Sequence, residues 1–438
     1  MTLKTRRILF YALIALFIVS GTSVIFYSSG WRLDFETLTI SRLGALFFEI
    51  QPDHATISIE KTPYQFNPGL LKSGLLIANL FPKTYTVKVV KEGYQPWTKE
   101  LRVRPSLVTE VSPILLIPEK IDLGAAVETD ISDFWVGPKH LIVKKENGEL
   151  YLNKEKIVGN QIVQWSKDGN EAITALNSQY FYINLQKPNS ALNVSLIFDS
   201  LRDGSDQSPI QRIYFDSFNE NNLMLITYRQ WYRLNLKKQT LATIYEKAPE
   251  AVAVNGNEFI FSDQNSVIAY NPSLNAITRL FTVDAGIQEL SASNDFITVL
   301  DKNKNLWLFN RRTSVSEEKI SDRVQIAPLF SPDKTNIAFI NEDKEVVVYD
   351  LFSKEKSGGQ KTFRMNIGII EKNSIRWHAN SGYLFIKYPN SLYLLEASNI
   401  PPINFQVIDL ENQKYEYKPD STLYLLKNSD LYEIDLRQ

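Results

Sequence analysis

An uninterrupted apolar stretch near the N-terminus dominates the hydrophobic pattern of the chain. Ile8–Tyr27 runs for 20 residues without a charge, directly after the basic residues Lys4, Arg6 and Arg7. At about 1.5 Å per residue, a helix of this length extends about 30 Å, the thickness of a bilayer's hydrocarbon core. The pattern predicts a transmembrane helix over residues 8–28, preceded by a cytoplasmic N-terminus of residues 1–7.

A cleaved signal peptide is the alternative interpretation of this stretch. Signal peptides have a shorter apolar region of about 7–15 residues and a small-residue cleavage site. Tyr27-Ser28-Ser29-Gly30 matches such a site poorly, so we favour an uncleaved anchor. The positive-inside rule then predicts a single-pass membrane protein with extracytoplasmic C-terminal domains, although Arg32 and Arg42 weaken the charge bias.

Short alternating segments follow the predicted helix. Ala55–Ile59 and Tyr85–Val90 alternate with period two, as half-buried strands do. Leu43–Ile50, Leu101–Arg104 and Val108–Leu116 are further strand candidates, and no segment in this region has the 3.6-residue period of a helix. The pattern predicts a compact β-sandwich or sheet over residues 43–117.

Four stretches of this region match a known family pattern: Leu43–Ile50, Pro52–Ile57, Ala78–Val89 and Lys91–Tyr94. On these stretches, residues 43–117 resemble the PEGA domain family. Lys83 departs from the family's turn glycine, and the first hairpin lacks the usual Asp-Gly turn. The resemblance implies a non-catalytic, extracytoplasmic accessory module, and it supplies no ligand.

Beyond Pro118 the chain repeats an apolar strand that closes on an Asn, Asp or Glu residue. The repeated segments are Leu150–Asn153, Tyr180–Asn184, Trp231–Asn235, Val267–Asn271, Leu306–Asn310, Val346–Asp350, Leu392–Glu396 and Leu431–Asp435. Their mean spacing is about 40 residues, which is the length of one four-stranded propeller blade.

A second mark, an aromatic residue followed by a turn, precedes several of these strands. It occurs at Trp165–Gly169, Phe330–Lys334, Trp377–Gly382 and Tyr417–Ser421. Pro suits such a turn because it fixes φ, and Asp does because it bonds its own backbone. We expect each aromatic residue to end an inner strand and to pack between repeat units. The two marks together predict an all-β fold with a β-propeller of seven or eight blades over residues 120–438.

Phe330–Asp333 with Asn336–Phe339 resembles the WD40-like repeats of TolB-type β-propellers, and the similarity extends in degenerate form over residues 120–438. An array of β-sandwiches is the alternative architecture. In a propeller, we expect Ile121–Val127 to supply the missing outer strand of the last blade and so to close the ring. We expect Gln186–Pro209 to form an extended outer hairpin or loop.

Composition and charge mainly exclude functions. The 438 residues include 48 Lys and Arg against 49 Asp and Glu, so the formal net charge of −1 disfavours a nucleic-acid partner. The absence of cysteine excludes disulfides, thiolate metal sites and cysteine nucleophiles. The three histidines, His54, His140 and His378, are not clustered, and there is no Gly-x-Ser-x-Gly motif. These features disfavour a catalytic zinc site and a serine triad.

Three polar segments match ligand-binding loops only in part. Asp301–Asn305 has the spacing of a calcium loop, but Leu306 replaces the invariant glycine, so we expect a hairpin turn. Asp199–Asp206 is acidic and loop-like, and it is a weak calcium candidate. Lys354–Lys361 lacks the Gly-Lys-Ser/Thr of a phosphate loop and indicates a solvated loop.

Four other residues have a structural and a functional interpretation. His378 takes the place of Ser166 and Ser331 in other repeats, so we expect a turn residue. Exposed Trp side chains stack on sugars or lipid headgroups in some proteins, but core packing or interface anchoring is commoner. The three Trp residues concerned are Trp31, Trp97 and Trp135.

The leading hypothesis is a membrane-anchored binding or scaffold protein of the cell envelope. Its propeller would engage a protein or a cell-envelope glycan, without a cofactor or a metal and without catalysis. The alternative is a propeller-type hydrolase or lyase that uses carboxylates around the central channel. That alternative requires two carboxylates about 5–9 Å apart in a deep pocket. The sequence assigns no catalytic, cofactor-binding or metal-binding residue.

Overall fold

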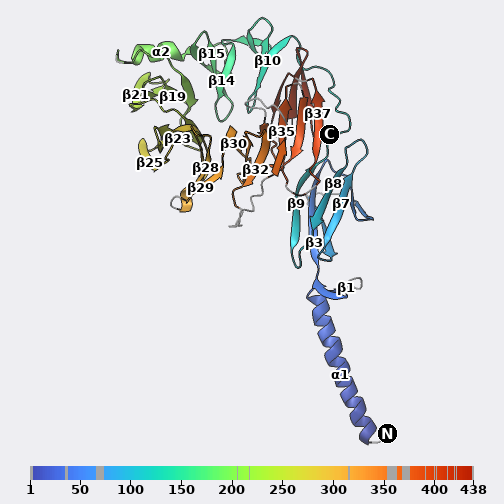
Figure 1. The fold of residues 1–438 in the computed structure, drawn as a ribbon. Coiled ribbons are helices and arrows are strands. Elements are labelled where there is room, and N and C mark those ends of the chain that lie inside the picture. The colour runs from blue at the N-terminus through green and yellow to red at the C-terminus, as the bar shows by residue number, and fades with distance from the viewer. Residues whose placement is uncertain are drawn as a thin grey trace. The chain divides into compact units, whose positions relative to one another are not determined.

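The computed structural model describes residues 3–34, 38–65, 74–204, 206–216, 218–313, 316–352, 363–366, 375–389, 391–398, 400, 402–411, 413–418, 420 and 422–436 (Figure 1). These residues fall into two compact units. The first unit takes in the described residues of 3–121 and 398–406, and the second takes in those of 122–397 and 407–436.

The first unit begins with the helix α1 (Leu3–Ser28), which contains the whole predicted span. No residue of α1 is buried, and the mean hydropathy of its most apolar 18-residue window is 2.4. By length and composition the helix is able to cross a membrane, and a signal sequence meets the same criteria. A short hairpin of β1 (Trp31–Asp34) and β2 (Thr39–Arg42) follows the helix.

The rest of the first unit consists of two sheets that enclose one apolar core. One sheet has the strand order β6-β3-β9, with bounds Leu75–Leu80, Gly44–Gln51 and Val108–Leu115. The other has the order β5-β4-β7-β8, with bounds Thr62–Gln65, Thr56–Ile59, Thr84–Val90 and Trp97–Arg102. Alternate side chains of both sheets point into the shared core, for example Phe48, Val87 and Trp97. The buried Lys99 donates a hydrogen bond to the Ile400 carbonyl at 2.7 Å, within the same unit.

The second unit is a series of antiparallel sheets in which each strand pairs with the next along the chain. In the described residues there are seven four-stranded sheets and a final three-stranded one. We number these sheets 1 to 8 in chain order.

The first four sheets run from β10 to β25. Their strands are β10 (Ile131–Val136), β11 (Leu141–Lys145), β12 (Leu150–Leu152), β13 (Glu155–Ile157), β14 (Gln161–Trp165), β15 (Glu171–Leu176), β16 (Gln179–Asn184), β17 (Leu192–Asn193), β18 (Arg212–Phe215), β19 (Asn222–Ile226), β20 (Trp231–Asn235), β21 (Thr240–Tyr245), β22 (Val252–Asn255), β23 (Glu258–Asp263), β24 (Ser266–Asn271) and β25 (Ala276–Thr282).

The other four sheets run from β26 to β40. Their strands are β26 (Ile287–Ser293), β27 (Phe296–Asp301), β28 (Leu306–Asn310), β29 (Ser316–Ser321), β30 (Val324–Phe330), β31 (Asn336–Asn341), β32 (Glu345–Asp350), β33 (Phe363–Asn366), β34 (Ile375–Trp377), β35 (Tyr383–Tyr388), β36 (Ser391–Glu396), β37 (Phe405–Leu410), β38 (Lys414–Tyr417), β39 (Thr422–Lys427) and β40 (Asp430–Asp435). A 3-10 turn, η1 (Arg311–Thr313), follows β28.

The repeated strand of the sequence is the third strand of each sheet, from β12 to β40. In sheets 2 to 6 its terminal polar residue starts the next turn, because the side chain accepts a hydrogen bond from a backbone N–H two or three residues on. The Oδ1 of Asn235 accepts from Lys238 N at 2.7 Å, and the Oδ1 of Asp350 accepts from Phe352 N at 2.9 Å. One repeat unit of the sequence therefore corresponds to one sheet of the structure.

The aromatic mark ends the first strand of its sheet, as expected. Trp165, Phe330, Trp377 and Tyr417 are the last residues of β14, β30, β34 and β38. Three of them contact the preceding sheet directly, and Tyr417 does so through the ring of Phe385. The Trp377 indole N–H donates to the Leu329 carbonyl at 2.9 Å, and a Cβ on Gly137 would lie 2.6 Å from the Trp165 ring. The prediction that these aromatics pack between repeat units is confirmed for Trp165, Trp377 and Tyr417.

Consecutive sheets share their apolar cores. Sheets 1 and 2 form one cluster, and further clusters join each pair of neighbours up to sheets 6 and 7. Sheets 7 and 8 meet through aromatic contacts such as that between Phe385 and Tyr417, whose ring centroids are 4.7 Å apart. Figure 1 shows the sheets following one another from β10 through β19, β23 and β30 to β35. Such a series fits a β-propeller.

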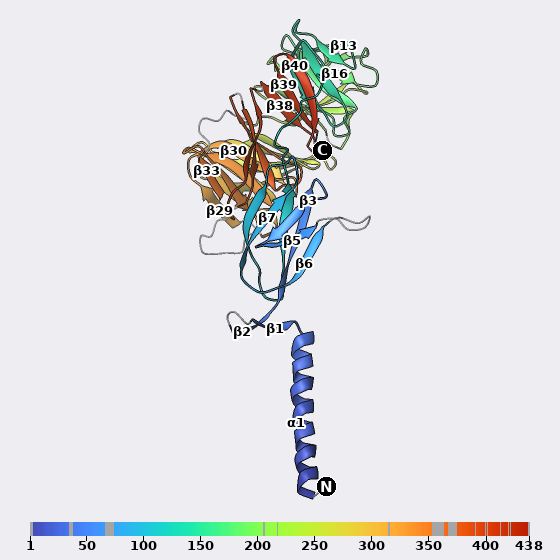
Figure 2. The same cartoon turned by 90° about the vertical axis from the view of Figure 1, so that its right-hand side faces the viewer.

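The last sheet packs against the first. Phe134 and Val143 of sheet 1 share a core with Tyr424 and Leu431 of sheet 8, and Figure 2 shows β38–β40 beside β13. The Lys414 ammonium bonds Asp133 Oδ1 at 2.7 Å across the same junction. Contact between the first and last sheets closes the series into a ring.

The chain segment entering the ring also contacts β40, but not as the predicted strand. Ile121–Val127 forms no strand, and a single bridge joins Glu128 to Leu431. Val127 N donates to Leu431 O at 2.8 Å, and Ile131 N donates to Ser429 O at 2.8 Å. The predicted place of closure is right, whereas the extended fourth strand is wrong because the ladder ends after one bridge.

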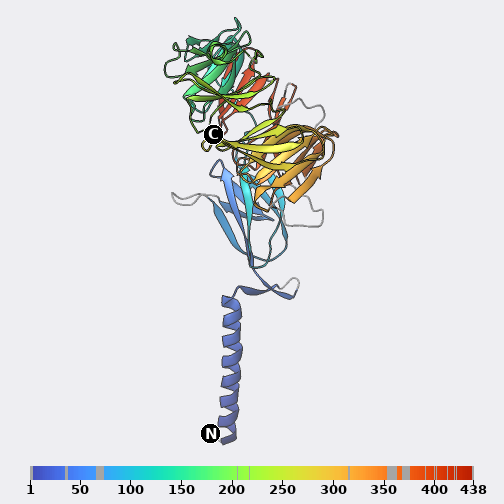
Figure 3. The ribbon, with the colours of Figure 1, turned by 90° about the vertical axis from the view of Figure 1, so that its left-hand side faces the viewer.

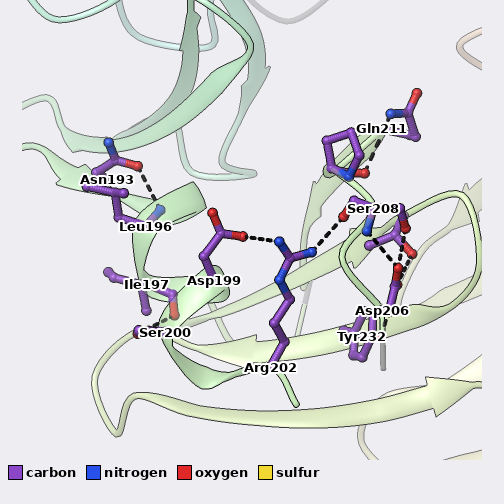
Figure 4. Close-up of polar contacts among 12 residues, drawn as sticks. Asn193, Leu196, Ile197, Asp199, Ser200, Arg202, Asp206, Ser208, Gln211 and Tyr232 are labelled. Carbon is purple, nitrogen blue, oxygen red and sulfur yellow. Dashed lines mark hydrogen bonds and ion pairs between the residues drawn. The ribbon is translucent and has the colours of Figure 1, made fainter. Parts of the chain in front are cut away.

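The predicted hairpin or loop at Gln186–Pro209 is wrong in its central part. After β17, the chain forms the helix α2 (Val194–Leu201), which packs Val194 and Phe198 into the core between sheets 2 and 3. The Asn193 side chain caps α2 by accepting from Leu196 N at 3.0 Å (Figure 4). A capped amphipathic helix therefore replaces the expected loop.

Candidate interaction face

One edge of the second unit collects the turns that the sequence marks. In an antiparallel meander, the turns after the first and third strands lie at one edge of the sheet, and the turn after the second lies at the other. We call the edge with the first and third turns the turn face. Its first turns are residues 137–140, 166–170, 216–221, 256–257, 294–295, 331–335, 378–382 and 418–421, of which 217, 419 and 421 lie outside the described residues.

The marked turns share one hydrogen-bonding scheme. In sheet 2, Ser166 Oγ accepts from Glu171 N at 2.9 Å, and Asp168 Oδ1 accepts from Asn170 N at 2.9 Å. In sheet 6, Ser331 Oγ accepts from Asn336 N at 2.9 Å, and Asp333 Oδ1 accepts from Thr335 N at 3.1 Å. Asp216 of sheet 3 starts a similar turn, accepting from Phe218 N at 2.9 Å.

First turns of neighbouring sheets also bond to one another. Lys139 Nζ donates to Asn170 Oδ1 at 3.0 Å between sheets 1 and 2. Asn294 N donates to Asn255 Oδ1 at 2.9 Å between sheets 4 and 5, and Lys334 Nζ donates to Asn294 Oδ1 at 2.9 Å between sheets 5 and 6. These contacts join the first turns of three pairs of neighbouring sheets in a polar rim.

His378 continues this rim between sheets 7 and 8. The side chain is buried, and the Asn380 N–H donates to its Nδ1 at 3.2 Å. In the neutral ring Nε2 therefore carries the proton, and it donates to the Tyr417 hydroxyl at 2.7 Å. Burial lowers the pKa of His378 to about 4. The expectation of a turn residue is confirmed, because His378 N bonds Tyr383 O as Ser166 N bonds Glu171 O.

The other two histidines belong to turns other than that of His378. His140 ends the first turn of sheet 1, where its carbonyl accepts from Gly137 N at 2.8 Å. Burial, together with the charges of Lys139 and Lys418, lowers the pKa of His140. His54 belongs to a turn of the first unit with a φ of 64°.

Three carboxylates meet where the first turns of sheets 2 and 3 adjoin. Asp168, Glu171 and Glu220 each place a carboxylate oxygen within 4.8 Å of the others. Burial raises the pKa of Glu171 and of Glu220, and neighbouring carboxylates add to both shifts. The Asn170 N–H bond lowers the pKa of Asp168. The second oxygen of Glu171 is buried without a hydrogen-bond partner.

This cluster matches a divalent cation site only in part. Hard oxygen donors suit calcium or magnesium, but the sites need further ligands beyond three carboxylates. Asp168 already accepts from Ser166 Oγ at 2.7 Å and from Asn170 N. The cluster therefore concentrates negative charge at one place on the turn face. Sequence reasoning missed it because Glu220 has no motif of its own and reaches Asp168 through the packing of adjacent sheets.

Large apolar side chains are exposed on the same turn face. Phe218 lies in the first turn of sheet 3 and is 62% exposed, and Leu274 lies in the third turn of sheet 4 and is 73% exposed. Phe352 begins the third turn of sheet 6, is also 62% exposed, and contacts Phe296 edge-on at 5.5 Å between centroids. Exposed apolar side chains gathered on one surface are typical of interaction sites.

In the two candidate calcium loops, carboxylates already bind hydrogen-bond donors or cations of the protein. Asp301 is buried and accepts from Asn305 N at 2.8 Å and from Trp307 Nε1 at 3.0 Å, which confirms the expected hairpin turn. Asp199, within α2, pairs with Arg202 at 2.9 Å (Figure 4), and the buried Asp206, after α2, accepts from Thr227 Oγ1 at 2.6 Å. Asp199, Asp206 and Asp301 are therefore each bound by protein groups.

Of the remaining sequence candidates, two Trp residues are packed within the protein, one Trp lies in a hairpin, and one segment falls outside the described residues. Trp97 is buried in the core of the first unit, and Trp135 is half-buried with the Lys414 ammonium 4.8 Å from its ring centroid. Trp31 lies in the hairpin after α1. Lys354–Lys361 falls outside the described residues.

Comparison with known proteins gives matches in structure alone. No family model matches the chain, and no curated protein matches its sequence. A chain from "Crystal Structure of Mitotic Checkpoint Complex" aligns at a TM-score of 0.45 and 13% identity, covering 72% of this chain and 97% of that one. The β-propeller domain of Myceliophteria thermophila Cps50 (Swd1) aligns at a TM-score of 0.42 and 12% identity, covering 73% and 99%.

A third alignment, to Kuenenia stuttgartiensis hydrazine synthase, has a TM-score of 0.40 and 11% identity and covers 65% of this chain and 99% of that one. All three TM-scores lie below 0.5, so these alignments carry no argument about function. The propeller assignment rests instead on the closed series of sheets in this chain.

Proposed function

We propose that this chain is a membrane-anchored, extracytoplasmic interaction protein whose propeller binds a protein partner through the turn face. α1 is the anchor, and the PEGA-like first unit is a non-catalytic accessory module. The observation that carries the proposal is the exposure of Phe218, Leu274 and Phe352 at the same edge of sheets 3, 4 and 6. Aromatic and aliphatic side chains of this kind form the cores of protein interfaces, surrounded by polar groups.

The polar surroundings fit such an interface. The first turns of sheets 4, 5 and 6 are joined by side-chain hydrogen bonds, and the turn that carries Phe218 is ordered by the bond from Phe218 N to Asp216 Oδ1. Preorganised support lowers the entropy lost when a partner binds. The carboxylates of Glu171 and Glu220 lie at the same edge and favour a partner with basic groups opposite them.

Site-specific photo-crosslinking in cells tests the proposal. A photoreactive phenylalanine analogue replaces Phe218 in one variant and Tyr228 in another. The two positions lie beyond opposite ends of the same strand, β19. Both side chains are largely exposed, at 62% and 69%. We expect a discrete crosslinked protein from position 218 and none from position 228. Equal crosslinking from both positions, or from neither, would reject the turn face as the binding surface.

Affinity measurements with that partner complete the test. Phe218→Ser and Leu274→Ser should each weaken binding by about tenfold or more, as expected for interface anchors. Tyr228→Ser should leave binding unchanged. Protease access to the propeller in intact cells tests the topology separately, and protection of the propeller from added protease would reject the extracytoplasmic placement.

A carboxylate-dependent hydrolase is the second candidate function. The raised pKa of Glu171 beside a second carboxylate is the property that a general acid requires. This candidate predicts turnover of cell-envelope glycan fragments that is lost in Glu171→Gln and retained in Phe218→Ser. Crosslinking to a protein partner together with no turnover would leave the interaction proposal standing alone.

A further inference from the structure

The hairpin that follows α1 has two chemically different faces. Directly opposed residues of paired strands lie on the same face of the ribbon. Trp31 pairs with Arg42, and Leu33 pairs with Ile40, so these four side chains share one face. The Arg42 guanidinium lies 5.1 Å from the centroid of the Trp31 ring, as this arrangement requires. The opposite face carries Arg32, Asp34, Thr39 and Ser41.

The first of these faces is apolar and uncovered. Leu33 is 43% exposed and Ile40 is 61% exposed, even though both are strand residues. A two-stranded hairpin alone is marginally stable in water, so an apolar face of this kind needs a cover. The three apolar members of the face are Trp31, Leu33 and Ile40, and we call this surface the hairpin's apolar face.

Several contacts fix the hairpin at the end of α1. Arg32 donates to the Tyr27 carbonyl at 2.7 Å, and its guanidinium lies 3.5 Å from the centroid of the Tyr27 ring. The Phe26 and Trp31 rings lie 6.1 Å apart, and Leu43 N bonds Gly30 O at 3.1 Å. Figures 1, 2 and 3 all show the hairpin extending sideways from the end of the helix. A helix that crosses a membrane would therefore hold this ribbon along the membrane surface.

We infer that the hairpin is a second, interfacial membrane contact: its apolar face lies at the boundary between lipid headgroups and acyl chains. This inference rests on the proposed anchoring by α1. The apolar residues up to Tyr27 extend about 30 Å as a helix, so Tyr27 reaches the edge of the hydrocarbon core and Trp31 lies just beyond it. Aromatic residues concentrate at this depth, and a guanidinium such as that of Arg42 binds lipid phosphate there.

The lack of cysteine in the chain provides a direct depth measurement, because one introduced cysteine takes a single fluorescent label. Ile40→Cys probes the apolar face, and Thr39→Cys is its matched control, because Thr39 is the adjacent exposed residue on the polar face. Ile18→Cys probes the middle of α1. Each full-length variant is reconstituted into vesicles of three parts phosphatidylethanolamine to one part phosphatidylglycerol.

The label at position 40 should show blue-shifted emission, quenching by a lipid nitroxide near the headgroup, and protection from aqueous iodide. The label at position 39 should be quenched by iodide, and the label at position 18 only by a nitroxide deep in the acyl chains. Iodide quenching at position 40 with deep quenching at position 18 overturns the inference and leaves the anchor intact. Iodide quenching at position 18 overturns both the anchor and the inference.

Discussion

Replacement of Leu431 by alanine should loosen the junction that closes the ring. Leu431 is fully buried against Phe134 and Tyr424, and its backbone forms the bridge to Glu128. Truncating a buried leucine removes its transfer free energy and leaves a cavity, which together cost about 3 kcal/mol or more. Native-state hydrogen exchange of the full-length protein should show faster exchange first in β10, β39 and β40, because the lost contacts join these strands.

Leu300→Ala is the matched control for this prediction. Leu300 is also buried, at 1% exposed, but it belongs to the core of sheets 5 and 6. The same truncation there should cost a similar amount and accelerate exchange in β27 and β31 instead. If Leu431→Ala accelerates exchange in β10 no more than Leu300→Ala does, the first and last sheets do not stabilise each other, and the account of ring closure is wrong.

Three further predictions concern stability. Burial raises the pKa of Glu171 above its ordinary 4.5, so the contribution of this carboxyl group to stability is lost as the pH rises. Glu171→Gln should therefore raise the melting temperature more at pH 7 than at pH 4. A larger rise at pH 4 would contradict the pKa shift. Because the pKa of His378 falls from 6.5 to about 4, the protein should lose on the order of 1–2 kcal/mol between pH 7 and pH 5, and His378→Ser should lessen that loss in urea titrations. Gly137→Ala places a Cβ 2.6 Å from the Trp165 ring and should cost about 1–3 kcal/mol by thermal melting, whereas Gly204→Ala meets nothing within 4 Å and should be neutral.

The sequence predicts the repeating unit because its marks are local. Asn235 and Asp350 mark the ends of third strands, because their side chains cap the turns that follow. Trp165 and Phe330 mark the ends of first strands, because each precedes a Ser-x-Asp turn. These residues act on backbone groups two to five positions away, so the signal survives in a single sequence. The turn at Asp216 lacks Pro and Gly, so the sequence pattern does not mark it. It nevertheless follows the aromatic Phe215 in the same way.

The helix α2 was missed for a different reason. It has eight residues, too few for a helical period to stand out, and an all-β expectation favoured a hairpin. Asn193 as a capping residue before an apolar segment was the available signal.

The candidate face could not be predicted from the sequence, because it depends on which turns share an edge. Phe218 and Leu274 are 56 positions apart in the chain, and each appears alone as an apolar residue near polar ones. Only the strand order places both at the same edge of neighbouring sheets. The carboxylates of Asp168 and Glu220 likewise become neighbours through packing between sheets.

The bridge between Glu128 and Leu431 also has a mechanical consequence. If α1 anchors the chain and the propeller holds a partner, as proposed, tension along the chain before the ring would reach it at Val127. There the hydrogen bonds to Leu431 and Ser429 pass the load straight to β40, so the first and last sheets bear it together. Tension that enters through Val127 would load its hydrogen bond to Leu431 before it loads β10.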